Sequence, residues 1–268
     1  MLLTLMLASR VEAAQVACEP LHVIDTRPGY SAQAVPPDAP LTMILWSNCE
    51  GSTNWTLSVE DESGAVLAAA PWTWDGGEWA LAVLTPPTRL PSNATLTVQA
   101  TPDGGSTNDS PAWSNSFTTG DADLQGMTGL PTATMDSAIW YQDGGNALTW
   151  TDLSPAPDPD GLSYFVIDGI GSPSQYLVAD HPLDDVPFML QPGVDEPTEL
   201  CVDVQQVDGT GTPSDLVTTC MTDFDRSFSA PPGLCSTGPG KGSFAGALLV
   251  ALALSSRVLD VRRVRKEP

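Results

Sequence analysis

Basic residues are scarce in the body of this chain. Between residues 18 and 236 only Arg27, Arg89 and Arg226 are basic, against thirty acidic residues in the same stretch. The resulting formal charge of −27 repels nucleic acid and anionic membrane surfaces, and its self-repulsion favours a soluble monomer. The pattern is typical of a solvated acidic coat, and it governs behaviour in solution without specifying a fold.

Histidines and catalytic motifs are scarce as well. His22 and His181 are the only two histidines, and they lie in different halves of the chain. The sequence contains no HExxH, no Gly-rich phosphate loop, no CxxC and no recognisable Ser/His/Asp arrangement. We therefore expect a non-enzyme without catalytic residues or cofactor. Ca²⁺ is the one candidate ligand, because Asp158, Asp160 and the acids around Asp184 offer oxygen atoms, although solvated turns have the same composition.

Helix signals are nearly missing between the ends. The 25 prolines and 23 glycines separate short runs rich in Val, Leu, Thr and Trp, which is typical of an all-β sandwich. We predict two tandem Ig-like or fibronectin-III-like β-sandwiches at 18–120 and 131–228, joined by a linker at 121–130. The expected strands cover residues 41–47, 55–60, 66–69, 78–84, 95–100 and 114–118 in the first half, and 147–150, 164–168, 176–179, 199–207 and 216–221 in the second.

The first 17 residues resemble a secretory signal. An apolar core runs from Leu2 to Ala8 and is followed by a small-residue exit near Ala13. No basic residue precedes the core, so the charged start of a full signal is missing. A lipoprotein box ending at Cys18 is the alternative, although Gln15 stands where that motif has Leu.

The last 40 residues carry a topology signal. A Gly/Pro/Ser linker at 229–241 contains Cys235 and precedes an uncharged apolar run, which we expect to form a helix at 242–257. A basic tail at 258–268 follows, and positive residues beside an apolar segment stay on the cytoplasmic side. The run is shorter than the roughly 20 residues of a comfortable membrane span. We therefore expect an exported body held at the membrane through this helix or through a modified Cys235.

Five cysteines divide into two local pairs and one remainder. Export implies an oxidising compartment, where local pairs close as disulfides. We predict one bridge between Cys18 and Cys49 and another between Cys201 and Cys220. Cys235 is left as a processing or anchoring residue, with a free or intermolecular thiol as the alternative.

Three motifs of the first half occur in the order of a known family. They are VPPDAPL before the strand LTMILWS, then LTPPTRLPSNATLTVQA at 84–100, and a closing SFTTG at 116–120. Over about 95 residues, this order resembles bacterial Ig-like domains of the S-layer SbsA type, with Trp46 in place of the usual Phe and Leu96 in place of the usual Tyr. The resemblance implies an Ig-like sandwich over this half.

The tail has a resemblance of its own. A cysteine in a small-residue linker, a short helix of Ala, Leu, Val and Gly, and terminal arginines resemble the MYXO-CTERM sorting signals of myxobacteria. The resemblance implies cleavage of the tail and anchoring through Cys235 at the cell surface or outer membrane of a Gram-negative bacterium. A single cysteine and Asp260 among the basic residues depart from that pattern, and a plain membrane anchor is the alternative.

Three tryptophans are the candidate ligand-binding residues. Trp72 and Trp74 alternate on one expected strand, and Trp79 follows an Asp-Gly-Gly turn. Exposed, such rings stack on sugars or anchor a protein partner; buried, they fill a core. We therefore expect a cell-surface protein for display, adhesion or protein interaction. The alternatives are a carbohydrate-binding module and a Ca²⁺-stabilised adhesin.

Overall fold

The computed structural model describes residues 21–47, 52–76, 78–103, 113–193 and 195–227. These residues form fifteen strands and no helix, so the all-β prediction is confirmed. The strands are β1 (His22–Arg27), β2 (Leu41–Trp46), β3 (Thr53–Asp61), β4 (Val66–Trp74), β5 (Trp79–Leu84), β6 (Thr95–Pro102), β7 (Trp113–Thr118), β8 (Thr132–Tyr141), β9 (Asn146–Ser154), β10 (Tyr164–Gly169), β11 (Gln175–Val178), β12 (Leu183–Leu190), β13 (Leu200–Val207), β14 (Val217–Met221) and β15 (Asp225–Ser227).

The strands build two β-sandwiches of the same topology. In the first sandwich, a sheet ordered β1-β2-β5 faces a sheet ordered β4-β3-β6-β7. In the second, the sheets are β12-β9-β8-β15 and β11-β10-β13-β14. Adding seven to each strand number of the first sandwich gives the order of the second, with β15 as an extra strand parallel to β8. The two halves are therefore structural repeats of one Ig-like unit, although no repeat is visible in the sequence.

Each sandwich has its own core because its strands alternate between buried and exposed positions. In β3, Trp55, Leu57 and Val59 point into the first core. In the neighbouring strand β6 of the same sheet, Leu96, Val98 and Ala100 point into the same core. The second core contains Phe165, Ile167, Val202 and Val204 among others. The alternation expected in β3 and β6 is thus confirmed by their burial.

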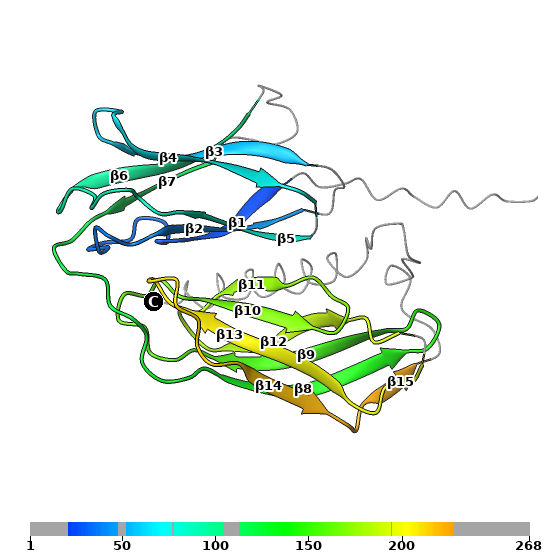
Figure 1. The fold of residues 1–268 in the computed structure, drawn as a ribbon. Coiled ribbons are helices and arrows are strands. Elements are labelled where there is room, and N and C mark those ends of the chain that lie inside the picture. The colour runs from blue at the N-terminus through cyan, green and yellow to red at the C-terminus, as the bar shows by residue number, and fades with distance from the viewer. Residues whose placement is uncertain (1–20, 48–51, 77, 104–112, 194, 228–268) are drawn as a thin grey trace, which may run out of the picture.

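The sandwiches lie against each other, so four sheets stack in layers (Figure 1). The sheet β1-β2-β5 lies between the other sheet of its own sandwich and the sheet β11-β10-β13-β14 of the second one. Strands β5 and β11 are in contact across this boundary. Two middle sheets are therefore covered on both faces.

One of the two expected disulfides lies within the described residues. Cys201 and Cys220 are directly opposite each other in β13 and β14, and they form the predicted bridge with a Cα–Cα distance of 4.1 Å. Cys18, Cys49 and Cys235 lie outside the described residues. The same holds for the segment at 1–17 and for the tail at 229–268, so the expected signal and apolar helix stay predictions. In the part of the chain that is described, no helix is long and apolar enough to cross a bilayer.

Candidate functional site

An apolar cluster joins the two sandwiches. From the first sandwich it includes the buried Ile44 of β2 with Trp79 and Leu81 of β5. From the second it includes residues of the opposing sheet, namely Tyr164, Val166, Tyr176, Val178 and Val207. We call this set the interface cluster. Removing apolar area from water is the main driving force of association, so the interface cluster holds the two sandwiches together as one packed body.

The sequence of β2 explains why this strand has two buried faces. Leu41, Met43 and Leu45 point into the first core, whereas Ile44 points to the second sandwich. All six residues of β2 are buried. A strand of a free sandwich would alternate apolar and polar residues, and LTMILW hardly does so.

Strand β10 mirrors this arrangement from the other side. Phe165 and Ile167 belong to the second core, and Tyr164 and Val166 belong to the interface cluster. Burial raises the pKa of the Tyr164 phenol, and the nearby Tyr176 adds to the effect. Strands β2 and β10 therefore both carry apolar residues toward the other sandwich as well as toward their own core.

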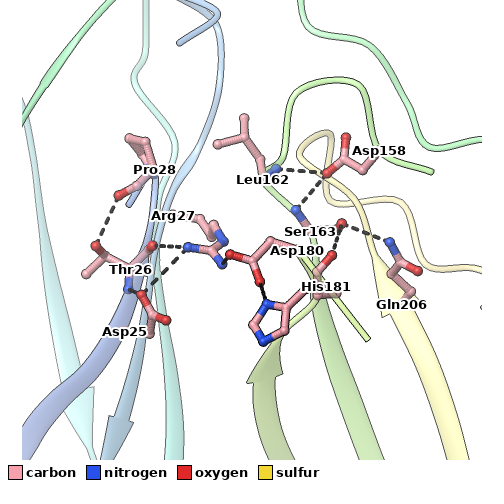
Figure 2. A network of polar contacts seen from close by, with 11 residues as sticks. Asp25, Thr26, Arg27, Pro28, Asp158, Leu162, Ser163, Asp180, His181 and Gln206 are labelled. Atoms are coloured by element: carbon pink, nitrogen blue, oxygen red, sulfur yellow. Dashed lines mark hydrogen bonds and ion pairs between the residues drawn. The ribbon is translucent and has the colours of Figure 1, made fainter. Parts of the chain in front are cut away.

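A polar network crosses the boundary beside the interface cluster (Figure 2). Arg27, at the end of β1 and 7% exposed, donates from its guanidinium to the Asp180 carboxylate at 3.0 Å. The other Asp180 oxygen contacts the Nδ1 atom of His181. Burial alone would raise the pKa of Asp180, but the hydrogen bonds from His181 and Arg27 and their charges lower it below 3.8. The carboxylate is therefore stabilised in its charged form.

Neighbours in the first sandwich fix the position of Arg27. Its guanidinium also donates to the Thr26 carbonyl at 3.0 Å and lies 3.7 Å from Asp25. The Thr26 hydroxyl donates to the Pro28 carbonyl, and the buried Asn115 amide donates to both of these oxygens. The side chain is thus held in place before it meets Asp180.

On the second sandwich, a tight turn inserts Leu162 into the first core. The Asp158 carboxylate accepts main-chain N–H groups from Leu162 at 2.8 Å and from Ser163 at 2.7 Å (Figure 2). Leu162 is 4% exposed and packs within the cluster of the first sandwich. Gly209 is needed beside it, because a Cβ there would lie 2.9 Å from the Cβ of Leu162.

The segment between the sandwiches is fixed by carboxylates from both sides. The N–H of Leu124 donates to Asp38 of the first sandwich at 3.2 Å. The N–H groups of Gln125 and Met127 donate to Asp160 and Asp208 of the second at 2.6 and 3.1 Å. Burial, and then the nearby charges of Asp158, Asp38 and Asp208, raise the pKa of Asp160 although its hydrogen bond from Gln125 opposes them. Asp160, which the sequence offered as a Ca²⁺ ligand or a solvated turn residue, thus helps Asp38 and Asp208 to position the linker.

All three basic residues of the body bridge segments that are distant in sequence. Arg27 joins the two sandwiches, and Arg89 binds Asp123 and the Asp121 carbonyl in the linker. Arg226 of β15 binds Glu196 and lies 5.0 Å from the centre of the Phe224 ring. The few cations of this polyanion are therefore used to hold its parts together.

The three candidate tryptophans do not form one exposed platform. Trp74 is 4% exposed in the first core, and Trp72 packs against the same core from its place two residues earlier in β4. Trp79 belongs to the interface cluster. Strands β4 and β5 lie in different sheets, so the rings separate rather than pair as a hairpin would pair them.

Among the described residues, the side chains of Ser163, His22 and the cysteine pair are of a kind used in catalysis or metal binding, but each of them is engaged in a structural contact. The buried Ser163 hydroxyl donates to the Ala179 carbonyl and accepts from the Gln206 amide, whereas His181 contacts Asp180. His22 packs edge-on against Trp46. A Glu199 oxygen and the sulfurs of Cys201 and Cys220 lie within 4.8 Å of one another, but a disulfide supplies no thiolate for a metal.

No family model matches the sequence, and no curated protein shows significant similarity to it. Similar solved structures include the BSP domain of a biofilm-associated protein, with 14% identity and a TM-score of 0.26 over 77% of this chain and 30% of that one. Fibronectin(III)-like modules of Clostridium thermocellum CbhA match with 8% identity and a TM-score of 0.24 over 77% of this chain and 94% of that one. A tetra-tandem repeat from the extending region of a large adhesion protein matches with 17% identity and a TM-score of 0.25, over 76% of this chain and 48% of that one. At these identities and TM-scores the likenesses carry no argument about function.

Sequence reasoning missed the interface residues. The sequence patterns single out neither Arg27, Ile44 nor Leu162, and they offer Asp180 only as one of the acids around Asp184 that could bind Ca²⁺. The available signal was the pair of strands LTMILW and YFVIDG, which lack the polar half that an outward sandwich face requires.

Proposed function

We propose that this chain is a non-catalytic cell-surface protein whose two Ig-like sandwiches act as one rigid acidic module for display or adhesion. The observation that carries the proposal is the contact between the sandwiches. A display module must hold its surface at a fixed place, and both the interface cluster and the bond between Arg27 and Asp180 restrict relative movement.

The linker supports rigidity independently of the interface. A flexible connection leaves its N–H groups to water, whereas here Leu124, Gln125 and Met127 donate to carboxylates of both sandwiches. The charge supports a place outside the cell, because an acidic coat keeps an isolated module soluble and away from anionic lipid.

The finer part of the proposal concerns anchoring. We propose export through the segment at 1–17 and retention through Cys235 after removal of the apolar helix and basic tail, in the manner of the sorting signals that the tail resembles. The resemblance of the first half to SbsA-type Ig-like domains fits a protein of the cell envelope.

Intact-mass spectrometry of the protein from native cell envelopes tests the anchoring, with Cys235→Ala beside the wild type and Ser236→Ala as the matched control. We expect a chain that ends near Cys235 and carries an added mass, which is lost in Cys235→Ala alone. An unmodified full-length C-terminus would mean a simple membrane anchor.

Attachment of whole cells tests adhesion with the same variants. Cells that export but do not retain the module should attach less than wild-type cells, and Ser236→Ala cells should match the wild type. Equal attachment of all three strains would leave display as the role and remove adhesion.

The proposal requires no cofactor. The Asp158 and Asp160 carboxylates, two of the candidate Ca²⁺ ligands, already accept main-chain N–H groups. We expect the melting temperature to be the same with Ca²⁺ as with a chelator. A rise with Ca²⁺ would support a calcium-stabilised adhesin, because a ligand that binds only the folded state must raise the melting temperature.

A further inference from the structure

Three of the six asparagines begin the motif Asn-x-Ser/Thr, the acceptor sequence for attachment of a sugar to the asparagine amide. They are Asn54, Asn93 and Asn108, and all three lie in the first half of the chain. So short a motif also arises by chance. The surroundings of each asparagine are therefore needed to choose among them.

Asparagines with and without the motif differ in burial. Asn54 and Asn93, which have it, are exposed, whereas Asn115 is 2% exposed and Asn146 is half-buried. Asn48 and Asn108 lie outside the described residues. Within the described part of the chain, the motif therefore coincides with the side chains that a sugar-transferring enzyme can reach.

Asn54 lies inside a sheet. It belongs to β3, where it is opposite Thr73 of β4, and its carbonyl accepts the N–H of Asp103 at 2.7 Å. Its side-chain oxygen accepts the Thr73 hydroxyl at 2.9 Å. The hydroxyl at the third position of this motif, that of Thr56, donates to Asp103 at 2.9 Å. Both polar ends of this motif are therefore engaged within the sheet.

Asn93 lies in a turn before β6 instead. Its φ of 53° is a left-handed value that asparagine adopts more readily than most side chains. Residues 91–93 are exposed, and so is Thr95, which supplies the hydroxyl of this motif. The turn thus presents the amide and the hydroxyl of the motif at the surface of the first sandwich.

The amide nitrogen of Asn93 meets an exposed partner and not the core. Its Nδ2 atom donates to the Asp121 carboxylate of the linker at 2.7 Å. An asparagine amide has two hydrogens, and a nitrogen that has gained a sugar keeps one of them. One hydrogen suffices for the bond to Asp121, so the modification is compatible with the contact between this turn and the linker.

The chain around Asn93 is free of acidic residues. Within residues 79–102 the only charged residue is Arg89, although the body as a whole carries thirty acids. A sugar donor with a phosphate leaving group is an anion, and a run of acids at the acceptor would repel it. The two linker acids that meet this turn, Asp121 and Asp123, are bonded to Asn93 and Arg89.

We propose that Asn93 is N-glycosylated by a sugar whose anomeric carbon carries a phosphate leaving group. Nδ2 forms a bond to that carbon, the bond from the carbon to the phosphate oxygen breaks, and one Nδ2 proton is released. The Thr95 hydroxyl is the part of the motif that the enzyme recognises. The inference rests on the proposed export, because the motif is used in exported chains.

Peptide mapping of the protein from native cell envelopes tests the proposal. Cleavage after acidic residues places Asn93 on residues 79–103, which contain no other asparagine, and Asn54 on residues 51–60. We expect the mass of one or more sugar residues on 79–103. Unmodified residues 79–103 overturn the proposal, whatever residues 51–60 carry. Cys235 lies on a different peptide, so failure of the proposed anchoring is seen separately.

Variants distinguish the motif from the turn. Asn93→Gly removes the acceptor and suits the positive φ, because glycine adopts it without strain. Thr95→Val removes the hydroxyl and leaves Asn93 in place, and both variants should lose the sugar. Thr95→Ser keeps the motif and should retain sugar, as should Ser92→Ala, the matched control. Sugar that persists on residues 79–103 of Thr95→Val overturns the proposal.

Discussion

The Arg27 guanidinium and the Asp180 carboxylate, 153 residues apart, form a hydrogen-bonded ion pair across the boundary between the sandwiches. The pair is asymmetric in its exposure, because the Arg27 side chain is 7% exposed and that of Asp180 is 46% exposed. Loss of the exposed partner, Asp180, should therefore lower the free energy of unfolding more than loss of the buried partner, Arg27.

Asp180→Ala should destabilise the fold more than Arg27→Met. The first change leaves a buried guanidinium with the Thr26 carbonyl and the more distant Asp25 carboxylate, whereas the second leaves a carboxylate that water can reach. We expect losses of about 2–3 kcal/mol for Asp180→Ala and about 1 kcal/mol or less for Arg27→Met, below the full penalty of a broken buried pair. Urea unfolding measures both, and the double variant should lie close to Arg27→Met. Equal losses in the single variants would contradict the assigned asymmetry.

The same pair predicts an acid sensitivity. The folded-state pKa of Asp180 is lowered from 3.8, so its contribution is present above that pH and is lost as the pH falls through the lowered value. The free energy of unfolding of the wild type should approach that of Arg27→Met as the pH drops below about 4. Urea titrations of both proteins across this range give the difference directly, and a constant difference would exclude Asp180 as the titrating group.

Ile44→Asp should uncouple the two sandwiches. A charge in the interface cluster opposes its burial, and the change should cost about 3 kcal/mol or more. We expect calorimetry to resolve two transitions in place of one joint transition. Val83→Asp is the matched control, because this residue of β5 is 44% exposed, and it should melt like the wild type. A single unshifted transition in Ile44→Asp would mean that the sandwiches unfold independently of this contact.

The bridge between Cys201 and Cys220 should stabilise the second sandwich. It closes a loop with a sequence separation of 19 residues, which corresponds to about 3 kcal/mol in the chain-entropy model. The double variant Cys201→Ala with Cys220→Ala should lose about 2–3 kcal/mol in urea unfolding. Any effect of reductant that persists in this variant reports on the other cysteines. An unchanged free energy of unfolding would show that pairing of β13 with β14 suffices without the bridge.

Glu78 should make the fold less stable in neutral than in mildly acidic solution. Burial raises the pKa of its carboxyl from 4.5 to about 7. The unfolded chain therefore ionises first, and stability falls as the pH rises from 4.5 to about 7, by up to about 3 kcal/mol. Glu78→Gln should be more stable than the wild type above pH 7 and should lack this slope. A melting temperature of Glu78→Gln that tracks the wild type at every pH would contradict the prediction.

Four strands escaped prediction, namely the three-residue β15 and three longer strands that share a common reason. β1, β8 and β12 each contain a register shift, so the alternation of apolar and polar residues breaks within them. β12 also contains Pro187, which a strand tolerates at a sheet edge because no ladder bond is lost there. Period-based reasoning finds regular strands such as β3, β6 and β13, and it fails where a strand is bulged, whether at a sheet edge as in β1 and β12 or inside the sheet as in β8.

The sequence by itself determined the class of this protein. The sequence specifies an acidic all-β protein through its frequent Pro and Gly, its alternating strands, the pair Cys201 and Cys220, and the scarcity of basic residues in its body. These properties act over short stretches of chain, so they can be seen without the fold. Only the tertiary structure decided how the two sandwiches meet. Ile44, Leu162 and the bond from Arg27 to Asp180 acquire their roles from residues that are far away in sequence. The sequence of one sandwich therefore does not show which of its outward faces the other sandwich covers.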